Sequence, residues 1–130
     1  MKVIACGSRT WTDAATILAR LDQFPPGTII VHGRSSGGGA DDLIDLMARR
    51  LGFTVIPMPV EDEDRRRAGR NQRRAPIFRN MRMFREHPDA TLVIAFWDGA
   101  SPGTRHMRDE ARRRRVEIDV VRQDGEQLSL

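Results

Sequence analysis

Three short segments of the chain combine glycine with hydroxyl or charged side chains, and each follows an apolar run. They read "CGSRTW" at residues 6–11, "HGRSSGGGAD" at 32–41 and "FWDGASPGT" at 96–104. Glycine allows positive φ angles and close approach of the backbone to another group. Backbone amides at glycine residues just before a helix are free to bind an anion. Residues 37–39 and 103–104 are expected to have such amides. The segments predict a phosphate site, with a flexible linker as the alternative for the middle one.

The same segments count against several other site types. No lysine follows the glycines as it would in a Walker motif, which counts against ATP hydrolysis. Neither the segment at 32–41 nor the one at 96–104 has GxGxxG spacing, which counts against ordinary NAD binding. The three histidines have neither metal-ligand spacing nor cysteine companions, and we predict no metal site. The acidic run at 41–45 could bind a divalent ion, but its first two aspartates also suit a first helical turn. Cys6, the single cysteine, lies in an apolar run and is expected to be buried.

Arginine accounts for nearly all of the positive charge, and Lys2 is the one lysine. Nine arginines and no acid occur within residues 65–85, directly after "EDED" at 61–64. This block is either an anion-facing surface or a solvated one. Trp11 and Trp97, at strand ends, either stack on a base or pack in the core. Because exposed aromatic residues are few, nucleic acid is a possible but less favoured partner.

Strand-like and helix-like patterns alternate along the chain. Apolar runs of strand length occupy 2–6, 28–32, 53–58, 91–97 and 116–121, and helical spacing occurs at 12–24, 41–52, 76–87 and 104–115. Residues 59–75 are too polar for a strand, and the tail after 121 has no period. Right-handed crossovers turn this alternation into a parallel sheet with helices on both faces. We predict a Rossmann-like α/β fold, about five parallel strands in the order 3-2-1-4-5, in a single domain spanning 1–130.

This topology predicts where a ligand binds. In open parallel sheets the site lies beyond the carboxyl ends of the strands, where the strand order reverses. The order 3-2-1-4-5 brings the segments after strands one, two and four side by side at that edge. The three glycine segments therefore form a predicted crevice, to which the hydroxyls of Ser8, Ser35 and Ser101 can add donors.

The motifs "GSRTWTD", "VHGRSSGGGADDL", "FRNMRMF" and "IAFWDGASPGTRHM" resemble those of the SLOG superfamily, in particular its YspA-like, cpYpsA-related branch of bacteria and phages. The resemblance covers residues 2 to about 121. It implies a Rossmannoid domain that binds a nucleotide-derived ligand, such as a nucleoside phosphate or an ADP-ribose-like molecule, and a homodimer or larger assembly. With the glycine segments, it predicts these ligand-binding residues: Gly7, Ser8, Arg9, Gly33, Gly38, Gly39, Ala40, Asp41, Arg79, Asn80, Asp98, Gly99, Ser101, Gly103 and Thr104.

The enzymes of this superfamily, the LOG-type phosphoribohydrolases, cleave the bond between a base and ribose 5'-monophosphate. They resemble the chain at Arg79 and at the glycine-threonine pair, but they carry a glutamate two or three residues later, where this chain has His106 and Met107. N-glycosidic cleavage needs a carboxylate to stabilise the cationic sugar or to position water. Binding or sensing is therefore the favoured function, and hydrolysis is the alternative.

Arg79 and Asp98 are the candidate catalytic residues for that alternative, while Asp109 and Glu110 are expected to face solvent. Arg79 lies off the apolar stripe of its helix, so we expect its loss to spare the core. A branched residue at Gly103 is expected to strain the turn before the last helix.

Two further expectations concern the setting of the protein. The arginine block supports a second alternative, nucleic-acid binding like that of the DprA branch of the superfamily. No apolar run approaches the roughly 20 residues of a membrane span, and the N-terminus lacks the features of a signal peptide. We therefore expect a cytoplasmic protein with no membrane partner.

Overall fold

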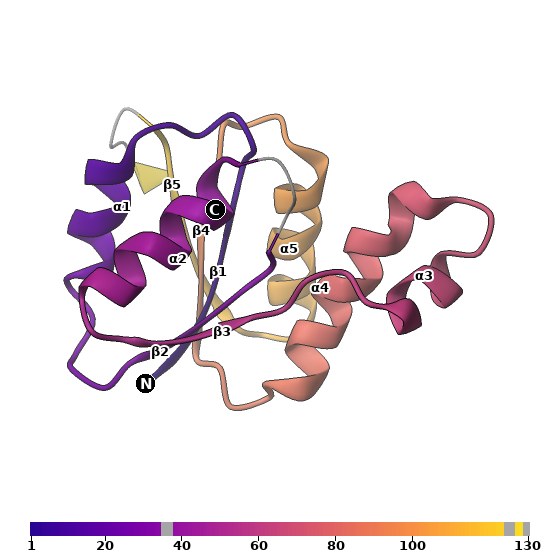
Figure 1. The fold of residues 1–130 in the computed structure, drawn as a ribbon, viewed down its shortest axis with the longest axis horizontal. Helices are drawn as coiled ribbons and strands as arrows, with labels where there is room; N and C mark the ends of the chain where they lie inside the picture. The colour runs from indigo at the N-terminus through magenta and orange to yellow at the C-terminus, as the bar shows by residue number, and fades with distance from the viewer. Residues whose placement is uncertain (35–37, 124–126, 129–130) are drawn as a thin grey trace.

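A parallel β-sheet forms the centre of the computed structural model, which describes residues 1–34, 38–123 and 127–128 (Figure 1). Its strands are β1 (Lys2–Gly7), β2 (Ile29–His32), β3 (Thr54–Pro57), β4 (Leu92–Phe96) and β5 (Glu117–Val121). They pair in parallel in the order β3-β2-β1-β4-β5. The predicted α/β fold and strand order are thus confirmed. A two-residue strand, β6 (Gln127–Leu128), adds antiparallel to β5 and is too short to show a period in the sequence.

Helices cover both faces of the sheet (Figure 1). On one face α1 (Ala14–Leu21) and α2 (Ala40–Arg50) enclose a core with β1, and on the other α4 (Ala75–Glu86) and α5 (Pro102–Arg113) enclose a second core. All five residues of β4 are buried, as expected for a parallel strand covered on both sides. Within the described part of the chain, no helix has the length and apolar character needed to cross a membrane.

Sequence signals at helix starts agree with the structure at two places. The side chain of Asp13 caps α1 by accepting a hydrogen bond from the Thr16 amide at 3.0 Å. Pro76 lies in the first turn of α4, where its missing N–H costs nothing. These two residues mark where α1 and α4 begin, and therefore where the preceding segments end.

The polar stretch after β3 contains a helix that the sequence pattern did not predict. We call residues 59–74 the arm; it includes α3 (Asp62–Ala68) and a 3-10 turn, η1 (Gln72–Arg74), and α3 lies beside α4, far from α1 and α2 (Figure 1). A capping box joins Glu61 and Asp64, and the buried Asp64 carboxylate binds Arg82 of α4 at 3.1 Å. Because α3 docks through charges, it lacks the apolar period by which helices are recognised.

Candidate functional site

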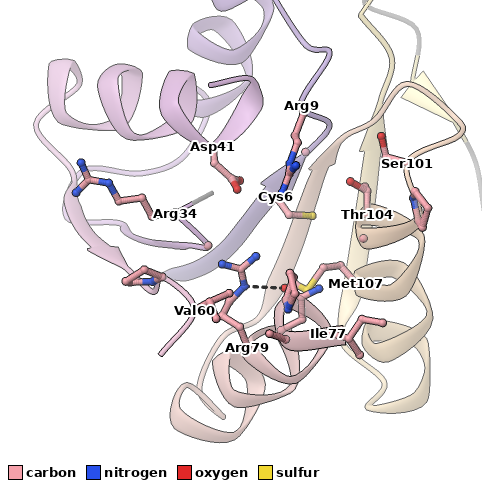
Figure 2. A pocket seen from close by; sticks show the side chains of 18 of the residues that line it. Cys6, Arg9, Arg34, Asp41, Val60, Ile77, Arg79, Ser101, Thr104 and Met107 are labelled. Carbon is pink, nitrogen blue, oxygen red and sulfur yellow. Dashed lines mark hydrogen bonds between the residues drawn. The ribbon is translucent and has the colours of Figure 1, made fainter. Parts of the chain in front are cut away.

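A cavity of about 800 Å³ lies at the carboxyl ends of the parallel strands, on the face covered by α4 and α5 (Figure 2). Its volume lies within the range typical of small-molecule sites, about 300–1,000 Å³. The segments after β1, β2 and β4 all contribute to the wall, together with the arm. Ten of the fifteen predicted ligand-binding residues line it: Gly7, Ser8, Arg9, Gly33, Asp41, Arg79, Asn80, Ser101, Gly103 and Thr104.

The charge of the cavity wall is strongly positive. Five arginines line it, and Asp41 is the one carboxylate among the lining residues that the structure describes. In Figure 2, Arg9 and Arg79 come from opposite sides of the cavity, and Asp41 extends from the start of α2. The arginines are Arg9, Arg34, Arg65, Arg73 and Arg79. Guanidinium groups suit phosphate and carboxylate oxygens, so the wall favours an anionic ligand.

The first turn of α5 adds backbone donors to this wall. Its N-cap, Ser101, makes no side-chain hydrogen bond to the helix, and Pro102 has no amide proton to satisfy. The next amides, of Gly103 and Thr104, belong to the first turn and so have no acceptor within the helix. Gly103 leaves this end of α5 open, because an added Cβ would meet no described atom within 4 Å. The helix dipole and these amides together favour an anion here.

Arg79 is buried, with 7% of its surface exposed, which corrects the expectation that its loss spares the core. Its Nη1 donates to the carbonyl oxygen of Met58 at 3.1 Å, and its Nε donates to Oδ1 of Asn80 at 3.0 Å. Burial lowers the pKa of the guanidinium, and the negative charge of Asp41 opposes that shift. The apolar stripe of α4 could not reveal this burial, because the arm covers the polar side of the helix.

Gly33, at the end of β2, makes room for the Arg79 side chain. A Cβ added to Gly33 would lie 2.4 Å from Cζ of Arg79, closer than real atoms approach. The φ angle of Gly33 is not positive, so space rather than backbone conformation requires glycine there. Gly33 therefore packs directly against the guanidinium of Arg79.

The glycine-rich segment before α2 serves backbone packing. Gly38 and Gly39 have φ angles of 83° and 87°, as their residue type predicts. A Cβ on Gly39 would lie 2.5 Å from Cα of Arg9, and the Ala40 amide donates to the Ser8 carbonyl at 3.0 Å. Gly39 and Ala40 thus pack against the loop after β1 and hold Ser8 and Arg9 in place.

Five predicted ligand-binding residues do not line the cavity: Gly38, Gly39, Ala40, Asp98 and Gly99. Of these, Gly39 and Ala40 form the packing contact just described. Two predicted donors lie outside the described residues, the Ser35 hydroxyl and the Gly37 amide.

Both carboxylate oxygens of Asp98 are used within its own loop and the neighbouring one. Oδ1 accepts from the amides of Ala100 and Ser101 at 2.8 Å, and Oδ2 accepts from Thr10 Oγ1 at 2.8 Å. Burial raises the pKa of Asp98, but these hydrogen bonds outweigh it and hold the pKa well below its usual range. Asp98 borders a separate hollow beside Arg122 instead of the main cavity. As a catalytic candidate it is therefore a fixed anion outside the main cavity.

The positions that follow the glycine-threonine pair carry no carboxylate into the cavity. Met107 lines the wall with 1% of its surface exposed. Glu110, expected to face solvent, is instead 2% exposed, and its oxygens bind Arg113 at 2.5 Å and Arg114 at 3.2 Å. The prediction for Glu110 was wrong because arginines at the end of α5 neutralise its buried carboxylate.

Both tryptophans belong to the core. Trp11 is 2% exposed and packs edge-on against Phe96, with ring centroids 5.4 Å apart. Trp97 is 5% exposed, and its Nε1 donates to the Ser101 carbonyl at 3.1 Å. Of the two readings open from the sequence, core packing holds, and neither ring offers an exposed stacking surface.

Part of the arginine block pairs with the acidic run that precedes it. Arg65 pairs with Asp62 at 2.9 Å, Arg85 with Glu63 at 2.7 Å, and the buried Arg82 with Asp64. Arg65 and Arg73 nevertheless line the cavity from the arm. Their place in the site could not be predicted, since it depends on how α3 docks against α4.

No group of three or more histidine, cysteine, aspartate or glutamate side chains is arranged to hold a metal ion within the described ranges. Cys6 lines the cavity floor and is buried, as expected, and burial raises the pKa of its thiol far above the usual value. The cavity thus offers guanidinium groups, amides and hydroxyls to a ligand, and the Cys6 sulfur stays protonated.

Comparison with known proteins relates the chain to one family. The family model "YspA, cpYpsA-related SLOG family" matches residues 1–63. The Gene 61 protein of Mycobacterium phage D29 is 36% identical over 124 residues, which cover 90% of this chain and 93% of the phage protein. No solved structure matches the chain significantly.

Proposed function

Because this chain belongs to the YspA, cpYpsA-related SLOG family, we propose that its cavity binds or senses a nucleotide-derived ligand, either a nucleoside phosphate or an ADP-ribose-like molecule. The family suggests a nucleotide-related binding role. The composition of the cavity wall carries the proposal. Five arginines and the open first turn of α5 line the cavity, and its described lining residues include one carboxylate.

The lining has separate parts for the two halves of such a ligand. The phosphate would lie at the start of α5, where the Gly103 and Thr104 amides and the Thr104 hydroxyl can donate. Arg79 would bind it from the floor through the part of its fork that Met58 and Asn80 leave open. The apolar face of a base or sugar would pack on the remaining wall, which includes Val60, Ile77, Met83 and Met107.

In this proposal the site binds its ligand without hydrolysing it. His106 and Met107 stand at the two positions where the LOG-type pattern has its glutamate, and neither side chain supplies the carboxylate that stabilises a cationic sugar. Asp98 lies outside the cavity and is held by four hydrogen bonds, while Asp41 lies in the field of Arg79. Among the described carboxylates only Asp41 lines the cavity, so the N-glycosidase alternative depends on that residue.

The structure gives less support to the nucleic-acid alternative than the sequence does. The acidic residues of α3 pair with much of the arginine block, which lowers the net charge of that surface. Both tryptophans are buried, so neither offers a platform on which bases could stack.

Thermal unfolding in the presence of ADP-ribose, AMP or inorganic phosphate tests the proposal. A ligand at about 100 times its dissociation constant adds roughly 2.7 kcal/mol to the free energy of unfolding. Arg9→Ala should reduce this stabilisation, whereas Arg66→Ala should not, because Arg66 is exposed on α3 and does not line the cavity. Unchanged melting temperatures with all three compounds at millimolar concentration would refute a nucleotide site.

A further inference from the structure

A line of polar contacts leads from the cavity into the contact between α4 and α5. Arg79 Nε donates to Asn80 Oδ1 at 3.0 Å, and Asn80 Nδ2 lies 3.4 Å from His106 Nδ1. On the other side of the ring, His106 Nε2 lies 3.7 Å from Glu110 Oε1. We call these four residues the polar line. Arg79, Asn80 and Glu110 are buried, and the His106 side chain is 20% exposed.

The chemistry at the cavity end fixes the direction of every donor along the polar line. A guanidinium can only donate, so the carbonyl oxygen of Asn80 must face Arg79 and its NH₂ group must face His106. Nδ1 of His106 must then accept, which leaves the ring proton on Nε2, directed toward Glu110. The arrangement is therefore consistent only with a neutral imidazole.

We propose that His106 is a positioning residue that holds the Arg79 fork in its ligand-binding orientation only while the imidazole is neutral. This inference rests on the proposed function, because it assigns Arg79 to the ligand. A proton on Nδ1 would place two donors opposite each other at Asn80. Turning the Asn80 amide would relieve that conflict but move it to Arg79 Nε, which breaks one of the two hydrogen bonds that orient the fork.

The groups around His106 leave the neutral form favoured near neutral pH. Burial lowers the pKa of His106; the carboxylates of Glu110 and Asp109 on α5 raise it, and Arg113 on the same helix lowers it. From α4 the ring faces Asn80, which is uncharged, with the Arg79 cation behind it. Arg113 and Arg114 both bind Glu110 and so weaken the attraction of that carboxylate for an imidazolium.

Ligand affinity should then fall as pH drops through the pKa of His106. If the protonated form does not bind, apparent affinity decreases roughly tenfold for each pH unit below that pKa. ADP-ribose is the suitable probe, because its pyrophosphate has no ionisation near neutral pH, whereas the second pKa of a phosphate monoester is about 6. Any change in affinity then reports on the protein.

NMR of the protein without ligand tests the positioning directly. We expect the Arg79 Nε–H signal to be sharp at about pH 7.5 and to broaden as His106 titrates below its ordinary pKa of about 6.5. Asn80→Asp should raise the His106 pKa, since a carboxylate can accept from both neighbours. His106→Asn offers Oδ1 as the acceptor without a titrating ring, and it should keep the Arg79 signal at low pH. An Arg79 signal indifferent to His106, or a His106 pKa unmoved by Asn80→Asp, would overturn the inference.

Calorimetric titration with ADP-ribose provides the functional readout. Between about pH 7.5 and about pH 5 the wild type should lose at least roughly tenfold in affinity, and His106→Asn should lose much less. His87→Gln is the matched control, because His87 also has a pKa lowered by burial but contacts Lys2 at the opposite end of β1. Equal pH profiles for wild type and His106→Asn would contradict the inference. If ADP-ribose, AMP and inorganic phosphate all fail to bind at every pH, the proposed function fails, and the NMR titration still decides whether His106 positions Arg79.

Discussion

Gly33→Ala is a small change aimed at the position of Arg79. The added methyl group would lie 2.4 Å from Cζ of Arg79 and 2.6 Å from its Nη1. Arg79 must therefore move, and its hydrogen bond to the Met58 carbonyl cannot survive in its present geometry. The backbone of Gly33 needs no adjustment, since its φ angle is not positive.

The expected cost follows from these two facts. Losing a buried hydrogen bond from a charged group costs about 1.5–3 kcal/mol. Replacing glycine by alanine at a compatible backbone position stabilises by about 0.4–1 kcal/mol. Gly33→Ala should therefore destabilise the wild type by about 1–2 kcal/mol. In an Arg79→Ala background the clash is gone, and the same change should be neutral or stabilise by up to about 1 kcal/mol.

Urea unfolding of the four proteins in this cycle gives the coupling energy between the two residues. We expect a coupling of about 1–3 kcal/mol, with Gly33→Ala harmful only when Arg79 is present. Effects that add within about 0.5 kcal/mol would show that Gly33 does not set the position of Arg79. The single variant should also weaken ADP-ribose binding, because its displaced fork no longer faces the cavity.

Three further predictions concern other parts of the site. Gly103→Val should leave the urea midpoint nearly unchanged, because an added Cβ meets open space on a helical backbone. The same change should weaken ADP-ribose binding by about tenfold or more, because the valine side chain covers the α5 amides. Wild-type affinity in this variant would remove this helix end from the site. Asp64→Ala should cost about 3 kcal/mol in urea unfolding by depriving buried Arg82 of its main partner, and a loss under about 1 kcal/mol would contradict that. Incubation with AMP should release no adenine that chromatography can detect. Turnover of about 1 per second would instead favour the hydrolase alternative.

The sequence predicted the sheet well because its signals are local. Most of the apolar runs lie next to glycine or proline, and the right-handed crossover rule then limits the strand order. The short β6 and the arm escaped prediction for different reasons. β6 has two residues, and α3 is held by charges, so neither shows an apolar period.

The candidate site was predicted in outline but not in depth. Glycine segments at strand ends located the cavity, since strand order alone brings them together. Helical periodicity places apolar side chains, and it gave no means of knowing that Arg79 is buried against Met58, which is distant in sequence, or that Glu110 is buried beside arginines of its own helix end. The expected strain at Gly103 was wrong for a related reason, because the residue lies within α5 instead of in the turn before it.

Mapping ADP-ribose binding by amide chemical shifts tests the central claim most directly. The account predicts that the largest changes fall on the Gly103 and Thr104 amides and on the Arg79 Nε–H group, all of which line the cavity. Changes confined to Arg66 and Arg70 on the exposed side of the arm, or no change at millimolar ADP-ribose, would contradict it.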